Sequence, residues 1–254
     1  MMFRIVLIGY IVIIIFGRAL TPYDPRTTQP EIALQAPTWA HPAGTDALGR
    51  DVLSRALHGG TQTLTSAAAA ACLALGIGLL VGLRMGGTRI DAGIDTLIAA
   101  GLTIPSIIVA LLAITLIGNS DWALIIAVST AQIAPVARLT RTLAQGAARA
   151  DYVQAADALG ARPLRLLTRH ILPNIVPTLA AYACVTFGAC IMNGATLTFL
   201  GLGGEIGRAE WGAMLYEGRQ AFRTAPWIAF VPGIGITCAV LLLNELSDRL
   251  TRIR

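Results

Sequence analysis

The chain has 254 residues, of which 55% are hydrophobic and only 13% charged, and its mean hydropathy is +0.68. Because soluble domains carry roughly 25% charged residues, this composition excludes an ordinary water-soluble domain and predicts an all-α integral membrane protein. The net charge of +5 comes from 19 arginines without any lysine, and these arginines punctuate apolar segments instead of gathering on one polar face. Binding to nucleic acid is therefore not expected.

A helix needs roughly 20 mostly apolar residues to cross the hydrocarbon core of a membrane. Six segments meet or approach this length: residues 3–20, 64–83, 94–117, 122–139, 175–202 and 227–243. The fourth and sixth contain Pro135 and Pro232, which spanning helices tolerate when neighbouring helices satisfy the freed carbonyls. The sequence thus predicts about six transmembrane helices, with a first helix in 1–20, a polar segment in 21–63 and a five-helix core in 64–250.

An alternative for the first apolar segment is a cleaved signal peptide, since Arg4 precedes a long apolar run. That run is longer than the roughly 7–15 residues of a signal-peptide core, and no convincing small-x-small cleavage site follows it. The residues that come next, 21–25, have the composition of a loop. We therefore expect an uncleaved first span.

The arginines also predict sidedness, because the cytoplasmic loops of membrane proteins carry an excess of basic residues. With a cytoplasmic N-terminus, 12 arginines and six acidic residues lie inside, against seven arginines and eight acidic residues outside. The inside then carries a net charge of +6 and the outside −1, which together make the +5 of the whole chain. Both termini and the loop at 140–174 are therefore expected in the cytoplasm, and segments 21–63 and 203–226 outside.

Acidic and basic residues alternate within residues 44–55, just before the second expected span. As a capped amphipathic helix on the outer membrane face, this stretch would let Asp46 and Asp51 reach Arg50 or Arg55. A structural role is favoured over direct contact with a substrate.

No metal site is expected in this chain. His41 and His58 flank the charged stretch, 17 residues apart, without a patterned third ligand. The four cysteines lie in apolar segments and lack a CxxC or Cys/His spacing, which favours small buried hydrophobic side chains over zinc ligands.

Two polar residues fall at membrane depth, Gln132 in the fourth expected span and Asn193 in the fifth. Such side chains usually face a bundle interior or a water-filled path. A place along a translocation path and a plain interhelical hydrogen bond are equally favoured for both. In the second span, Gly76, Gly78 and Gly82 are expected to allow close helix packing rather than flexing.

The cytoplasmic loop at 140–174 has strong local signals for two short helices. Asp151 is expected to cap a helix that begins at Tyr152, and Gly160 to end it in the position after the C-cap. Pro163 suits the first turn of a second helix. The loop is therefore predicted to be a helical hairpin that projects from the membrane.

At this loop the chain resembles the permease subunits of bacterial ATP-binding-cassette importers. Their signature loop has two small residues three positions before a glycine, and an apolar-x-L-P ending. Here Ala155 and Ala156 precede Gly160, residues 171–173 read Ile-Leu-Pro, and Gln154 stands where the family has glutamate. Residues 44–55, 197–203 and 211–215 further resemble the second permease of dipeptide, oligopeptide and nickel importers. The resemblance covers about residues 21–250.

The resemblance implies the type I importer permease fold in a bacterial inner membrane. It implies three kinds of partner: a homologous second permease, two cytoplasmic ATPase subunits and an external substrate-binding protein. It also assigns the docking of the ATPase to one stretch of the coupling loop at 140–174, namely Tyr152, Val153, Gln154, Ala155, Ala156, Asp157, Ala158, Leu159 and Gly160.

The chain is expected to be a non-catalytic subunit that binds no cofactor of its own. It contains no G-x-x-x-x-G-K-[ST] phosphate loop, so ATP and magnesium are expected on the partner ATPases. The sequence does not decide whether the substrate is a dipeptide, an oligopeptide, nickel or a metal chelate. The brief tail before the first span slightly favours nickel and metal chelates.

Two other function classes are considered. A self-contained secondary transporter would have Asp95 and Asp121 as first candidates for a proton relay, but both lie near span ends and no expected span has an acidic residue near its middle. A membrane-embedded hydrolase is disfavoured because no histidine lies inside a span and Ser106 and Ser129 have no nearby base in the sequence.

Overall fold

The computed structural model describes residues 17, 19–84, 89–203 and 207–252, and within them the chain is helical without named strands. This confirms the all-α prediction. The helices, in chain order, are η1 (Pro30–Ile32), α2 (Val52–Gly82), α3 (Arg89–Thr103), α4 (Ser106–Ile117), α5 (Asp121–Ala148), α6 (Asp151–Ala158), α7 (Pro163–Leu166), the π-helical turn η2 (Leu167–Ile171), α8 (Leu172–Phe199), α9 (Trp211–Gly218) and α10 (Trp227–Arg252).

Four helical stretches in the described residues are long and apolar enough to cross a membrane: α2, α5, the continuous run Pro163–Phe199 and α10. The bent pair α3–α4 makes a fifth if it counts as one span. The first expected span, 3–20, lies outside the described residues except for its last positions. The helix ends differ from expectation, since α2 begins at Val52 rather than at residue 64 and α5 continues to Ala148 rather than ending at 139.

The third expected span, 94–117, is not one straight helix. Its two halves, Ala92–Thr103 and Ser106–Ile117, meet at an angle of 98°. Pro105 is the cause, because proline has no N–H to donate and keeps the preceding residue out of the helical region. Pro105 has extended backbone angles and takes the N-cap position of α4. The prediction of a continuous helix was wrong.

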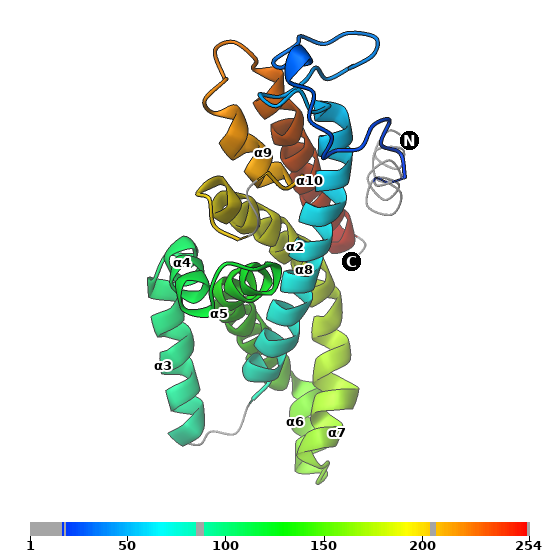
Figure 1. Ribbon diagram of the computed structural model, residues 1–254. Coiled ribbons are helices and arrows are strands. Elements are labelled where there is room, and N and C mark those ends of the chain that lie inside the picture. The colour runs from blue at the N-terminus through cyan, green and yellow to red at the C-terminus, as the bar shows by residue number, and fades with distance from the viewer. Residues whose placement is uncertain (1–16, 18, 85–88, 204–206, 253–254) are drawn as a thin grey trace.

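Helix α5 lies at the centre of the bundle and packs against α2, α4 and α8 (Figure 1). Glycines of α2 permit the closest of these approaches. A Cβ on Gly78 would lie 2.6 Å from Val136 Cγ1, and one on Gly82 would lie 2.6 Å from Thr140 Cβ. The packing role expected for these two glycines is confirmed. It is wrong for Gly76, where a Cβ would meet nothing within 4 Å.

The short helix α9 lies at one end of the bundle, against α8 and α10, whereas α6 and α7 project at the opposite end (Figure 1). Buried Trp211 begins α9 and donates its indole N–H to the carbonyl of Ala56 in α2, at 2.9 Å. The next residue, Gly212, faces Ala195 and Thr198 of α8. The two ends are called below the α9 end and the α6 end.

Replacing Gly212 with alanine is expected to destabilise the α9 end. The new Cβ would overlap Thr198 Oγ1 and the backbone of Ala195, whose Cα would be 2.8 Å away. Overpacking of this kind costs about 1–3 kcal/mol, which at this chain length lowers Tm by roughly 3–10 °C. Thermal unfolding in detergent measures it. Gly76→Ala, which meets open space, is the control and should not lower Tm; equal melting of the two variants would contradict the prediction.

Candidate functional site

The hairpin at the α6 end has the backbone that its sequence predicts. Helix α6 ends at its C-cap Leu159, and Gly160 follows with φ +81°, in the left-handed region that favours glycine. The N–H of Ala161 donates to the carbonyl of Ala156 at 3.1 Å, which is the closing bond of a Schellman turn. Pro163 then occupies the first turn of α7.

The helix start differs from the prediction by one residue. Ala150, with extended backbone angles, is the N-cap of α6, and no side chain caps the helix there. Asp151 is instead the first helical residue, where its carboxylate still interacts favourably with the positive end of the helix dipole. The expected capping role of Asp151 was wrong, although the helix itself is confirmed.

The hairpin is fixed to the bundle through one face. Val153 is 3% exposed and belongs to an apolar cluster that also contains Ala144 of α5 and Ile175 of α8. On the same helix, the Tyr152 hydroxyl accepts a hydrogen bond from the Asn174 amide at 3.2 Å. Helix α6 is therefore held against the ends of α5 and α8 that lie at the α6 end of the bundle.

The other face of the hairpin is open. Of the nine residues that the resemblance assigns to docking, only Val153 is buried and Ala156 is intermediate; the exposed ones are Tyr152, Gln154, Ala155, Asp157, Ala158, Leu159 and Gly160. Leu159 is 89% exposed, and Leu164 of α7 is 71% exposed. Small side chains beside two exposed leucines make a surface on which another protein can pack closely.

At the α9 end, residues 21–51 fold back over the start of α2. They are not the amphipathic helix expected for 44–55, because α2 begins only at Val52, with Asp51 as its N-cap accepting from the Ser54 N–H at 2.7 Å. Residues 44–50 form turns instead, closed by an isolated antiparallel bridge between Thr45 and Asp51. The imidazole of His41 pairs with Asp51 at 2.9 Å.

Four charged side chains hold these turns to the bundle and are called here the anchor cluster: Asp46, Arg50, Arg55 and Glu217. Asp46 Oδ2 pairs with Arg50 Nε at 2.7 Å and also with the Arg55 guanidinium. Glu217 of α9 lies 2.7 Å from nitrogens of both arginines. Asp46 is 2% exposed and Arg55 1%. The expected pairing of Asp46 with these arginines is confirmed, whereas Asp51 pairs elsewhere.

The anchor cluster keeps Asp46 ionised. Burial of its carboxyl by itself raises the pKa, but the positive charges of Arg55 and Arg50 and the backbone N–H groups of Arg50 and Leu48 more than offset this. The net pKa of Asp46 therefore lies below its ordinary value. The ionised carboxylate of Asp46 is the form that pairs with Arg50 and Arg55 in the folded protein.

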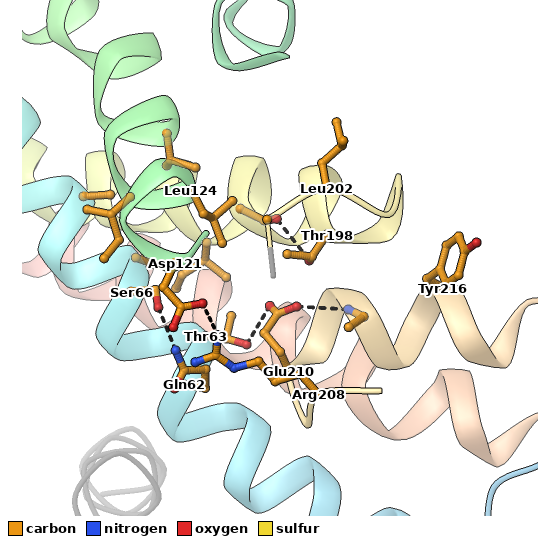
Figure 2. A pocket seen from close by; sticks show the side chains of 18 of the residues that line it. Gln62, Thr63, Ser66, Asp121, Leu124, Thr198, Leu202, Arg208, Glu210 and Tyr216 are labelled. Carbon is orange, nitrogen blue, oxygen red and sulfur yellow. Dashed lines mark hydrogen bonds and ion pairs between the residues drawn. The ribbon is translucent and has the colours of Figure 1, made fainter. Parts of the chain in front are cut away.

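A pocket of about 110 Å³ lies beside the anchor cluster, between α2, α5, α8 and α9 (Figure 2). Part of its lining is apolar and includes Leu124 and Leu202. Its polar lining includes Thr63, which donates to Glu210 at 3.0 Å, and the ion pair of Arg208 with Asp121. Dashed lines in Figure 2 mark these two pairs, which lie close together.

The two residues predicted to lie along a translocation path do not line this pocket. Gln132 of α5 is 8% exposed, and Asn193 of α8 is half-buried. Gln132 follows the lining residue Val128 by four positions, and Asn193 is next to the lining residue Gly194. Their role along a path stays a prediction.

Sequence reasoning missed Glu217 and Arg208. Both come from the segment after α8, and each pairs with a residue more than 80 positions away, at Arg50 and Asp121 respectively. One available signal was the density of charge in residues 44–55, where two arginines and two aspartates stand beside an apolar helix and call for partners.

Comparisons with known proteins agree with this geometry. Residues 74–253 match the family model "Binding-protein-dependent transport system inner membrane component". The dipeptide transport system permease protein DppC of Alkalihalophilus pseudofirmus is 34% identical over 97% of this chain and 82% of its own. The di/tripeptide transport system permease protein DppC of Pseudomonas aeruginosa is 33% identical over 93% and 80%.

The fold has a counterpart among solved structures. An inward-facing structure of the MetNI methionine ABC transporter superposes with a TM-score of 0.60, covering 78% of this chain and 92% of that chain at 18% identity. This likeness supports the type I importer permease fold expected from the sequence. The chain therefore belongs to the family of binding-protein-dependent transport system inner membrane components, and it is a multi-pass permease of an ABC importer in a bacterial inner membrane.

Proposed function

We propose that this permease imports dipeptides or other short peptides. It forms one half of a translocation path with a homologous second permease, and two cytoplasmic ATPases drive it. The observation that carries the substrate class is the identity of about a third, over nearly the whole chain, to permeases that are named for dipeptide and di/tripeptide transport. Neither of these relatives is named for nickel or a metal chelate, which the sequence alone leaves open.

The hairpin of α6 and α7 is the proposed docking site for an ATPase. It offers an exposed surface of small and apolar side chains, while buried Val153 ties the same helix to α5 and α8. Movement of a docked ATPase would therefore reach two spans directly. ATP and magnesium are assigned to the ATPases, and this chain binds no cofactor of its own.

The proposed sidedness places the α6 end in the cytoplasm and the α9 end outside, with both termini inside. Arginines at the α6 end support it, since Arg149, Arg162, Arg165 and Arg169 all lie in or beside the hairpin. The substrate then arrives at the α9 end from an external binding protein.

The secondary-transporter alternative finds little support in the side chains that it would use. Asp95 pairs with Arg141, whose Nη2 is 2.9 Å from Asp95 Oδ2, and Asp121 pairs with Arg208. Both carboxylates are thus engaged in ion pairs, and their side chains are 46% and 45% exposed instead of being enclosed within the bundle.

The test is uptake of a labelled dipeptide by proteoliposomes that contain both permeases, both ATPases and the external binding protein. We expect uptake only with internal ATP and external binding protein, and competition by unlabelled di- and tripeptides but not by chelated nickel. Competition by nickel alone would overturn the substrate class. Uptake without ATP or ATPases would overturn the importer mechanism in favour of a secondary transporter.

A further inference from the structure

Glu210 is a buried acidic side chain that belongs to neither the anchor cluster nor the ATPase-docking hairpin. It is 7% exposed, and its carboxylate accepts hydrogen bonds from the Thr63 hydroxyl and from the Ala213 N–H, both at 3.0 Å. Both donors are neutral. Among the residues that the structure describes, no arginine or histidine forms an ion pair with Glu210. A buried carboxylate without a cationic partner is costly, so its presence calls for an explanation.

Capping of α9 accounts for only part of this arrangement. Glu210 is the N-cap of α9, and one of its oxygens accepts from the Ala213 N–H. Glutamate is not among the residues usually favoured at an N-cap, where a shorter Ser, Thr, Asn or Asp satisfies the same N–H. The helix dipole favours a negative charge at this position, but an aspartate would supply that charge as well. The longer glutamate additionally extends its second oxygen to Thr63 of α2.

The other charges that line the pocket beside Glu210 are balanced. Asp121 pairs with Arg208. Glu217 belongs to the anchor cluster, in which two arginines and two carboxylates pair with one another. Glu210 therefore leaves one unbalanced negative charge beside a cavity of about 110 Å³. That volume has room for several water molecules, and equally for one charged end of a small ligand.

The lining of the pocket selects the charge and the chemistry of that ligand. An anion would need a free cation, but Arg208, the cation among the described lining residues, is held by Asp121. A metal ion would need several ligands, and the described part of the chain has no group of three or more His, Cys, Asp or Glu side chains placed to hold one. A single carboxylate suits an organic ammonium group, whose N–H groups donate charge-assisted hydrogen bonds to such oxygens.

The apolar part of the lining suits the remainder of such a ligand. It contains side chains of the spanning helices α5 and α8, namely Leu124, Ile125, Val128 and Ile191. Pockets that combine an apolar lining with a few convergent polar groups are typical of sites for small molecules. The pocket comes close to the surface at the Arg208–Asp121 pair, whose side chains are 28% and 45% exposed. A ligand with an ammonium group next to an apolar side chain therefore fits both parts of the lining.

We propose that this pocket receives the N-terminal ammonium group of a peptide substrate, and that Glu210 is the residue that binds it. The inference rests on the proposed function, and it deepens that function by naming the end of the peptide that this permease contacts. Thr63 orients the Glu210 carboxylate, and the apolar part of the lining takes the side chain of the peptide's first residue. A peptide with a blocked N-terminus lacks the charge that Glu210 binds.

The test measures binding of the dipeptide Leu-Gly to the complete transporter in lipid nanodiscs, without the binding protein, by saturation-transfer NMR. Wild type is expected to bind N-acetyl-Leu-Gly at least about 10-fold more weakly than Leu-Gly. Glu210→Gln keeps an acceptor for the Ala213 N–H but loses the charge. It should weaken Leu-Gly binding about 10- to 100-fold and no longer distinguish the two peptides. Glu210→Asp keeps the charge and should recover part of the loss. Glu31→Gln removes an exposed charge at the same end of the bundle; as the matched control it should leave Kd within about twofold.

Equal Kd values of wild type and Glu210→Gln for Leu-Gly would overturn the inference, as would the absence of binding to wild type. An equal loss for Leu-Gly and N-acetyl-Leu-Gly in Glu210→Gln would also overturn it, since Glu210 would then act only through the fold of α9. Failure of the proposed function looks different, because wild-type proteoliposomes would then take up no dipeptide. If they do take it up while binding is insensitive to N-acetylation, the inference alone fails.

Discussion

Replacing Gly160 with aspartate is expected to separate the permease from its ATPase while leaving the spans folded. A Cβ at Gly160 would meet nothing within 4 Å, so an aspartate side chain extends into solvent without a clash. The left-handed backbone at φ +81° is one that aspartate tolerates better than most residues. In the docked complex, however, the new carboxylate at position 160 would lie unpaired beside Leu159, in the close apolar contact between the hairpin and the ATPase. Such a charge costs several kcal/mol, so co-purified ATPase activity should fall at least ~10-fold.

The measurement is a pull-down of the tagged permease in mild detergent, followed by assay of vanadate-sensitive ATP hydrolysis. Gly146→Asp is the matched control: it adds the same charge at another exposed glycine of the α6 end, where a Cβ also meets nothing within 4 Å, but outside the hairpin. Gly160→Asn adds bulk and keeps the backbone preference without the charge. If Gly160→Asp retains the ATPase as wild type does, the hairpin is not the docking site.

The agreement between sequence and structure is best where the chemistry is local. The turn at Gly160 and the start of α7 at Pro163 follow from the two residue types with the narrowest backbone preferences. Hydropathy likewise locates the spans, because an apolar run must be buried in lipid or protein wherever the rest of the chain goes. Asp151 was misplaced by one position because a cap depends on the backbone angles of a single residue, Ala150.

The sequence-based predictions fail where a residue's partner is distant in the chain. They also fail where a helix continues beyond its apolar run. Helix α2 starts at Val52 and α5 runs on to Ala148, and these polar extensions carry no hydropathy signal. Pro135 and Pro105 look alike in the sequence, yet Pro135 stays within the continuous helix α5 while the third span bends by 98° at Pro105. Tertiary packing decides between those outcomes. The anchor cluster needs Glu217, which no local pattern joins to residue 50.

Neutralising Asp46 is expected to produce the largest loss of stability at the α9 end. Asp46→Asn would leave Arg50 and Arg55 with Glu217 as their remaining carboxylate partner, and Arg55 is 1% exposed. Breaking a buried ion pair by removing one partner costs about 3–5 kcal/mol, because an uncompensated charge stays buried. At this size Tm should fall by roughly 6–20 °C. Limited proteolysis within residues 21–51 should accelerate, since Asp46 holds the turns to α2 and α9.

The matched control is Asp24→Asn, because Asp24 is exposed and the one described bond of its side chain is local, accepting from the Arg26 N–H at 2.9 Å. It should change the free energy of unfolding by about 0.5 kcal/mol or less. Equal stability of the two variants would show that the anchor cluster does not hold this segment.

The same carboxylate makes a signed prediction for pH. The pKa of folded Asp46 lies below its ordinary value, so the unfolded chain binds its proton at higher pH than the folded chain does. The stabilisation is therefore complete above the unfolded pKa of about 4 and is lost as pH falls through the lower folded pKa. Wild type should lose Tm steeply below about pH 4, whereas Asp46→Asn should lose less over the same range. If the two acid profiles run parallel, Asp46 is not the group that titrates, and the stability of the α9 end must depend on another pair.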